Sequence, residues 1–194
     1  MVLPTLLAQT LDEALVMIRR GLEKDPLSLA LNMTEGWLLY MARKYELSID
    51  QYQKALELDP TSAQTISGLA AAYEMSGQSL QAFEQYQKWA KNGGVAESQI
   101  AALTAAYTSR GMRGYWLKRL AMEIEEEEKT GDIWTFEMAS LYARVGNTKQ
   151  ALSWLERAYE EHHDRLIALN VDPIFDGLRS ELRFIKLIQR IGFP

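Results

Sequence analysis

The sequence of 194 residues contains no cysteine and only two histidines. Without cysteine the chain forms no disulfide scaffold and offers no thiolate for zinc, iron–sulfur or nucleophilic chemistry. The charge has the wrong sign for a general nucleic-acid-binding protein, because 21 basic and 26 acidic residues give a formal net charge of −5. We therefore expect no direct contact between this segment and nucleic acid.

Long apolar runs are missing as well. The most apolar stretch, residues 27–42, is interrupted by Asn32 and Glu35 and is shorter than the ~20 apolar residues that a membrane-spanning helix needs. No basic residue precedes the apolar N-terminal residues, so a secretory signal peptide is not expected. These absences predict a chain without membrane contact, located in the cytoplasm, or in the periplasm if the segment belongs to a longer, anchored protein.

Proline is scarce, and its five positions leave no proline between Thr61 and Asp172. Because proline interrupts helices, such a long stretch without it is typical of a mostly helical chain. Apolar residues recur at three- and four-residue spacing, as in Ala82, Tyr86 and Trp89, which is the stripe of an amphipathic helix. No segment has the pattern of a strand of useful length.

The sequence repeats itself with a period of about 34 residues. Pro26 and Pro60 stand 34 positions apart in similar Asp-Pro-x-Ser contexts. A Tyr-x-x-x-Gly pattern keeps nearly the same step and places glycines at Gly77, Gly111 and Gly146. Since glycine readily adopts the left-handed conformation that closes a helix, each of these glycines is predicted to end one helix and begin a turn.

Helix starts are predicted where a capping residue stands three positions before Glu or Gln. This pattern occurs at Thr10, Ser48 and Asn147. Ser180 is a further candidate cap, at the start of a last helix. The apolar stripe of that helix comprises Phe184, Leu187, Ile188 and Ile191.

Three units of this period share further positions. The first unit contains Asn32, Glu35, Gly36, Leu39, Ser48, Tyr52, Ala55 and Pro60. The other two contain Leu69, Ala70, Tyr73, Ala82 and Tyr86, and Met138, Ala139, Tyr142, Ala151, Leu155 and Ala158. At these positions the sequence resembles the tetratricopeptide repeat family, in which Gly36 and Ala55 would stand where helices approach closely. Asn32, Trp89 and Gly94 depart from the family pattern, and residues 97–131 match it least.

The resemblance implies an all-α fold, a right-handed superhelix of helical hairpins with a C-terminal capping helix. It divides residues 1–194, as a single domain, into a partial repeat at 1–28, four repeats and a cap at 166–194. The four repeats comprise residues 29–62, 63–96, 97–131 and 132–165. Proteins of this family recruit other proteins, so the resemblance implies a non-catalytic scaffold or adaptor.

The C-terminal residues carry a second resemblance. The run Val171–Ser180, together with Arg183, Phe184 and Leu187, is similar to the ends of repeat domains attached to bacterial winged-helix regulators, serine/threonine kinases and nucleotide cyclases. This implies an alternative function, a regulatory or sensor domain of a bacterial transcriptional or signalling protein, with a small molecule as one class of ligand.

Catalytic signatures are missing, since neither a glycine-rich phosphate loop nor a Gly-x-Ser-x-Gly elbow occurs. His162 and His163 are adjacent, so on a helix they point about 100° apart and do not chelate one ion together. The acidic run from Glu125 to Glu128 is interpreted as a solvated helix face. We expect no enzyme activity, cofactor or metal; the alternative for the two histidines is a weak divalent-metal site with neighbouring acids.

The family resemblance also implies that the first helix of each repeat lines a concave groove. The positions mapped to this groove are Met33, Trp37, Tyr40, Gln64, Ser67, Ala71, Glu74, Ser98, Ala101, Ala105, Ile133, Phe136 and Ser140. None of them is Lys, Arg or Asn, which disfavours the clamping of an acidic C-terminal tail. Small residues between Trp, Met and Phe favour an extended apolar peptide or an amphipathic helix. The alternative for Trp37 and Phe136 is burial by neighbouring segments.

The N-terminal edge supports a second hypothesis. Residues 10–24 look like the second helix of a repeat whose first helix is missing or shortened to residues 1–9. Because repeats bury their apolar faces only against neighbours, an uncovered apolar edge is expected there. Either upstream residues of a longer protein or another subunit would cover it, which predicts a homo-oligomer through this edge.

Overall fold

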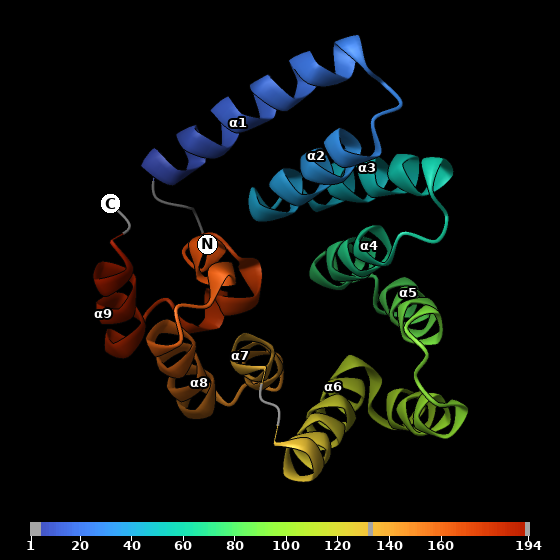
Figure 1. Ribbon diagram of the computed structural model, residues 1–194, viewed down its shortest axis with the longest axis vertical. Coiled ribbons are helices and arrows are strands. Elements are labelled where there is room, and N and C mark those ends of the chain that lie inside the picture. Colours follow the sequence, from blue (N-terminus) through green and yellow to red (C-terminus); the bar gives the residue numbers. More distant parts are fainter. Residues whose placement is uncertain (1–4, 132–133, 193–194) are drawn as a thin grey trace. The chain divides into compact units, whose positions relative to one another are not determined.

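The computed structural model describes residues 5–131 and 134–192, with the side chains of residues 5–8 excepted, and every regular element in these ranges is helical (Figure 1). The α-helices are α1 (Thr5–Lys24), α2 (Leu29–Met41), α3 (Tyr45–Leu58), α4 (Ala63–Met75), α5 (Ser79–Asn92), α6 (Glu97–Thr130), α7 (Thr135–Arg144), α8 (Thr148–Glu160) and α9 (Leu182–Ile191). Two short 3₁₀ helices, η1 (Asp164–Ala168) and η2 (Pro173–Leu178), precede α9.

The chain divides into two compact units, an N-terminal unit of residues 1–101 and a C-terminal unit of residues 102–194. In the N-terminal unit α1 packs against α2, α2 against α3 and α4, and α4 against both α3 and α5. In the C-terminal unit α7 pairs with α8, and η2 and α9 pack against that pair. The predicted all-α architecture of helical hairpins is confirmed. The division into one partial repeat, four repeats and a cap stays a prediction.

The turns that follow α4 and α7 have the geometry expected from the Tyr-x-x-x-Gly pattern. Gly77 and Gly146 adopt positive φ angles of 82° and 79°. In the first turn the amide of Gln78 donates to the carbonyl of Tyr73 over 2.9 Å, and the second turn repeats this bond between Asn147 and Tyr142. These bonds satisfy carbonyls that would otherwise be unpaired at the helix ends.

Two other helices end with the same bonds but without glycine. Arg43 follows α2 with φ 60°, and His162 follows α8 with φ 55°. The next amides, of Lys44 and His163, donate back to Leu39 and Ala158 over 2.9 Å. A side chain in this left-handed region is sterically disfavoured, so these two turns are less stable than their glycine counterparts.

Tyr52 on α3 fixes the spacing of α2 and α4. A Cβ atom added to Gly36 on α2 would lie 2.9 Å from the Tyr52 ring, and one added to Gly68 on α4 would lie 2.5 Å from its Cζ atom. The ring is therefore wedged between two glycines, which confirms the expected close approach at Gly36. Ser48 donates its hydroxyl to the Gly36 carbonyl over 2.7 Å and adds a buried bond at the same crossing.

Helix starts are only partly as predicted. Asn147 caps α8 by accepting from the amide of Gln150 over 3.2 Å, which confirms that cap. Ser48 and Thr10 lie inside α3 and α1, so both were wrong as caps. The last helix begins one residue later than predicted, because Glu181 and not Ser180 occupies its N-cap position.

Residues 97–130 form one hairpin that is bent at Arg110 and Gly111, where the backbone leaves the helical region. Gly111 interrupts the helix at the predicted position, but its φ of 61° and ψ of −153° differ from the left-handed helical conformation expected there. The two arms cross closely at Gly114, since a Cβ there would collide with the carbonyl of Ala106. Trp116 on the second arm is buried, and the guanidinium of Arg144 stacks 4.1 Å from the centre of its ring.

The C-terminal unit is closed by its last segments. Phe184 and Leu187 of α9 are buried together with Leu155 of α8, and Ile188 and Ile191 pack around them. This is the apolar stripe that the sequence predicts for the last helix. The 3₁₀ helix η2 contributes Phe175 and Leu178 to the same core.

Candidate functional site

Six of the predicted groove positions lie on neighbouring first helices of the N-terminal unit. Met33 and Trp37 are on α2, and Gln64, Ser67, Ala71 and Glu74 are on α4. We call these six residues the α2–α4 face. The two helices pack together, and the hydroxyl of Ser62 lies 3.9 Å from the sulfur of Met33 where α4 begins. By the 34-residue shift of the repeat, Met33 corresponds to Ser67 and Trp37 to Ala71.

Helical periodicity explains why these residues share a side. Positions 64, 67, 71 and 74 recur at three- and four-residue spacing, so they lie along one face of α4. The other side of α4 carries Ile66, Leu69 and Ala70, which are fully buried. Burial of the apolar side holds the helix in place and leaves the small and polar residues of the α2–α4 face outward.

Trp37 is the largest exposed side chain of this face, with 40% of its surface accessible. Gln64 is exposed, and Met33, Ser67, Ala71 and Glu74 are half-buried. Ser67 and Ala71 have small side chains on α4, the helix that packs against the α2 helix of Trp37. Such a surface can seat apolar side chains of a partner, since Trp is enriched among the residues that contribute most to protein interfaces.

Two predicted groove residues lie in the core instead. Tyr40 is only 5% exposed, and its ring centre lies 5.9 Å from that of Tyr45. Phe136 is 1% exposed, packed edge-on against Phe175 and stacked on His163 at ring-centre distances of 5.6 and 5.5 Å. For Phe136 the alternative, burial by neighbouring segments, is therefore the arrangement in the structure. A partner cannot reach either ring in this arrangement.

The remaining groove positions lie on α6, on α7 and in the segment between these two helices. Ser98, Ala101 and Ala105 are exposed on α6; Ser98 and Ala101 belong to the N-terminal unit, and Ala105 belongs to the C-terminal unit. Ser140 is buried and donates its hydroxyl to the carbonyl of Phe136 over 2.9 Å. Ile133 lies outside the described residues.

Charge on the first helices of the N-terminal unit is only negative. Helices α2 and α4 contain Glu35 and Glu74 and neither Lys nor Arg. Glu35 is buried and accepts a 2.7 Å bond from the Nε atom of Arg19. Glu74 accepts a hydrogen bond from the Tyr86 hydroxyl over 2.9 Å. This charge pattern suits neither an acidic tail nor a free carboxylate as ligand, because both need cations in the site.

His162 and His163 form hydrogen bonds with nearby backbone atoms. His162 forms a 3.1 Å hydrogen bond with the carbonyl of Glu160, and the Nδ1 atom of His163 accepts from the amide of Arg165. Within the described ranges no group of three His, Cys, Asp or Glu side chains is placed to hold an ion.

The acidic run at the end of α6 is partly neutralised. Glu125 pairs with Lys129 over 2.8 Å, one turn further along the helix. This hydrogen bond lowers the pKa of Glu125 and raises that of Lys129. Both side chains are well exposed, so the pairing fits the interpretation of this run as a solvated face.

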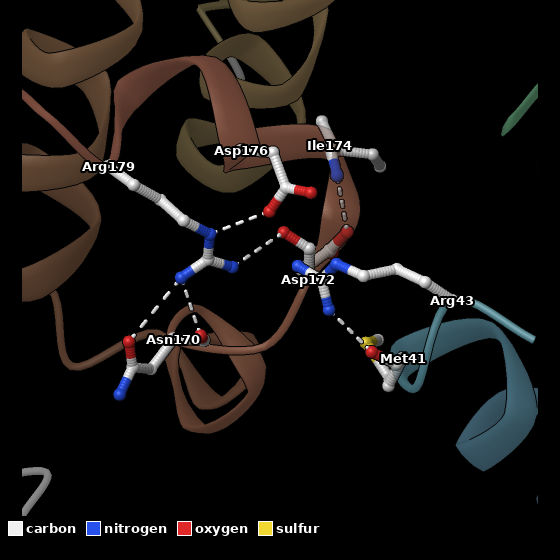
Figure 2. Close-up of polar contacts among 7 residues, drawn as sticks. All are labelled: Met41, Arg43, Asn170, Asp172, Ile174, Asp176 and Arg179. Carbon is white, nitrogen blue, oxygen red and sulfur yellow. Dashed lines mark hydrogen bonds and ion pairs between the residues drawn. The ribbon is translucent and has the colours of Figure 1, made fainter. Parts of the chain in front are cut away.

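One polar cluster was not predicted from the sequence (Figure 2). Arg179 donates through Nε to Asp176 and through Nη1 to the carbonyl of Asn170, both over 2.6 Å, and through Nη2 to the carbonyl of Asp172 over 3.3 Å. Asp172 caps η2 by accepting from the amide of Ile174 over 3.0 Å, and burial raises the pKa of its carboxyl group. Arg179 thus ties the end of η2 to the segment that connects η1 and η2.

This cluster stabilises the fold and is not a binding site, because the Arg179 bonds are made to its own loop. The sequence signal for it was an Asp-Pro pair at a helix start, Asp172 and Pro173, followed six residues later by Arg179. That signal predicts a cap but does not show which carbonyls the arginine reaches.

The helical hairpins and the glycines at their crossings define a class of protein, the helical repeat proteins. A family model described as TPR repeat matches residues 39–77, from the end of α2 through α3 and α4 to Gly77. This match confirms the resemblance to the tetratricopeptide repeats. No curated protein matches the chain. Tetratricopeptide repeats generally mediate protein–protein interactions and are generally non-catalytic.

None of the described helices is both long and apolar enough to cross a membrane.

Proposed function

We propose that this protein is a non-catalytic scaffold or adaptor that binds a peptide or a helix of a protein partner on the α2–α4 face. The observation that carries the proposal is the exposure of Trp37 on α2, which packs against α4, the helix that carries the small side chains of Ser67 and Ala71. An exposed tryptophan next to space for a partner's side chain is a favourable anchor for association.

The packing beneath the face supports this proposal. Tyr52 fixes the distance between α2 and α4 through close contacts at Gly36 and Gly68. Ser62 caps α4 by accepting from the amide of Thr65 over 3.3 Å. A face whose supporting helices are held in this way loses little conformational freedom on binding, so more of the contact energy appears as affinity.

The sensor hypothesis, with a small molecule as ligand, stays a prediction.

Direct capture of a partner by crosslinking tests the adaptor proposal. A photo-crosslinking amino acid at Ser67 reports partners of the α2–α4 face, and the same group at Gln81, exposed on α5, is the positional control. We expect a partner band from position 67 that Trp37→Ala removes and that Leu80→Ala, a truncation of an exposed residue on α5, leaves unchanged.

Both variants replace exposed or half-exposed side chains, so folding should be preserved and is checked by far-UV circular dichroism. Equal capture with and without Trp37, or capture only from position 81, contradicts the proposed binding face.

A further inference from the structure

Helix α1 corresponds to α3 by the 34-residue shift of the repeat, but the two helices differ in what covers them. Helix α3 lies between α2 and α4, whereas α1 packs against α2. On α3, Ser48 donates its hydroxyl to the carbonyl of Gly36, and Gln51 donates over 2.6 Å to the side chain of Asn32. The ring of Tyr52 packs against Gly36 beside them. One side of α3 is therefore occupied by the first helix of its own pair.

The corresponding positions of α1 are Ala14, Met17 and Ile18, which we call the α1 face. They share one side of the helix because they recur at three- and four-residue spacing, and all three are apolar. Ala14 and Ile18 are half-buried and Met17 is 72% exposed, although the three corresponding residues of α3 are buried. The α1 face thus has the place of a helix-packing surface, and no helix of the described residues is packed on it in the way that α2 is packed on α3.

Charged residues beside the α1 face are ordered along the helix. Glu13, Arg20 and Lys24 stand four residues before, three after and seven after Met17, so they follow the same side of α1. All three are exposed, and Glu13 accepts a hydrogen bond from the neutral side chain of Gln9 over 3.1 Å. The acid lies toward the N-terminal end of the face and the two cations lie toward its C-terminal end.

The other charged residues of α1 are placed elsewhere. Asp12 and Arg19 are held in ion pairs of 3.0 and 2.7 Å with Lys44 and Glu35. Glu23 lies about 120° around the helix from the middle of the α1 face. The charge order along the face is therefore set by one acid and two cations.

We infer that two copies of the chain associate through the α1 face, with their α1 helices antiparallel around a two-fold axis near Met17. A two-fold contact brings the same surface of both copies together, so the surface has to be complementary to itself. In the antiparallel arrangement the Glu13 end of one helix meets the Arg20 and Lys24 end of the other, whereas parallel helices would place like charges together. The apolar side chains of both faces are buried between these charges. This inference is independent of the proposed function, which uses α2 and α4.

The contact is small, because each copy contributes mainly one helix. Interfaces of this kind are at the lower end of the area that specific association needs, so we expect a dissociation constant of about 10–100 μM.

Cysteine crosslinking locates the contact, because the chain contains no cysteine of its own. The Met17→Cys variant carries its thiol at the proposed axis, so oxidation by oxygen with copper–phenanthroline should give a disulfide-linked dimer on a non-reducing gel. Glu13→Cys should crosslink with Arg20→Cys in a mixture but not with itself, since antiparallel helices separate the two copies of position 13 by about 12 Å along the axis. Leu80→Cys, at an exposed position of α5, is the control and should stay unlinked.

Sedimentation velocity of the full-length chain at about 5–200 μM measures the association itself. Glu13→Lys should weaken it by about three- to tenfold, because a two-fold pair contains the changed contact twice. Addition of Arg20→Glu and Lys24→Glu to Glu13→Lys restores opposite charges between the helices and should recover most of the affinity. Glu84→Lys makes the same change at an exposed position of α5 and should leave the association as it is. Far-UV circular dichroism checks that each variant is folded.

A disulfide-linked dimer from Met17→Cys together with recovery in the triple variant supports the inference. A chain that stays monomeric up to about 200 μM overturns it, which is the result expected if another segment or a different protein covers the α1 face. Equal dissociation constants for the natural chain and Glu13→Lys, or self-crosslinking of Glu13→Cys, overturn the antiparallel arrangement. None of these results changes the test of the α2–α4 face, which depends on crosslinking at Ser67.

Discussion

Replacement of Gly68 by alanine tests how tightly α2, α3 and α4 are packed together. In an unobstructed helix, glycine to alanine stabilises by about 1 kcal/mol, because alanine loses less conformational freedom on folding. Here the added Cβ would lie 2.5 Å from Cζ and 2.7 Å from the hydroxyl oxygen of Tyr52. The tyrosine ring must move to admit it, although Gly36 confines the ring on its other side.

The two effects can be compared directly. Overpacking a buried site costs about 1–3 kcal/mol, and the contacts at Gly68 are close and involve a ring that is buried on α3. A contact as short as 2.5 Å places the cost in the upper part of that range, about 2–3 kcal/mol, so after subtraction of the helix-propensity gain we expect Gly68→Ala to lower the free energy of unfolding by about 1–2 kcal/mol. For a chain of this size that corresponds to a fall of roughly 2–8 °C in melting temperature.

The assay is urea and thermal unfolding followed by far-UV circular dichroism, with Gly177→Ala as a control at a site where nothing lies within 4 Å of the new Cβ. In a Tyr52→Leu background the obstruction is absent, so Gly68→Ala should be neutral or stabilising, and the cycle gives the coupling between positions 52 and 68. Stabilisation by Gly68→Ala in the natural chain, or the same loss in both backgrounds, would refute the steric argument.

Four further outcomes are expected. His162→Gly should raise the free energy of unfolding by about 0.5–1 kcal/mol, because glycine relieves the positive φ angle; an unchanged or lower value in urea unfolding contradicts this. Arg179→Ala should lower the free energy of unfolding by about 1–3 kcal/mol, since two partly buried carbonyls lose their donor, and a loss below about 0.5 kcal/mol argues against the cluster's role. The hydrogen bond from Arg183 lowers the pKa of Glu156 below 4.5, so the Arg183–Glu156 interaction stabilises the fold above pH 4.5 and is lost as the pH falls through the folded-state pKa. Glu156→Gln should therefore flatten the pH dependence of the melting temperature in that range. A melting-temperature profile that Glu156→Gln leaves unaltered contradicts this prediction. Self-association through α1 should appear in analytical ultracentrifugation at micromolar concentrations and be weakened by Met17→Lys, as Met17 is 72% exposed; a monomer under all conditions contradicts it.

Features that depend on neighbouring residues along the chain could be predicted from the sequence. The turns at Gly77 and Gly146 follow from local pattern, because a positive φ angle after a helix needs little beyond glycine itself. The apolar stripe of α9 could also be predicted, since Phe184 and Leu187 recur at helical spacing. These turn glycines and apolar stripes depend only on residues a few positions apart, and so they can be located from the sequence alone.

Features that depend on distant segments could not be predicted. Ser48 has the sequence of a helix cap, but three preceding residues are already helical and its hydroxyl bonds across to Gly36. Phe136 occupies a groove position of the repeat, yet η2 and its Phe175 cover it. Local sequence patterns around Phe136 cannot predict that a segment about forty residues later in the chain packs over its ring.

The edge at α1 was also less apolar than the sequence suggested. Leu11 and Leu15 are buried, and α1 packs against α2, so only part of the expected stripe remains for a partner. The side chains that stay exposed on α1 include Val16 and Met17. Of the two alternatives for the first helix, missing or shortened to residues 1–9, the described residues show no separate short helix, because α1 is continuous over Thr5–Lys24.

Backbone amide NMR of the full-length chain, titrated with the partner segment that crosslinking at position 67 recovers, tests the central claim most directly. The account predicts shift changes concentrated on the α2–α4 face, at Trp37, Ser67 and Ala71, with a matching loss of affinity in Trp37→Ala. Shift changes confined to α5 around Leu80, or to residues of the C-terminal unit, would contradict it.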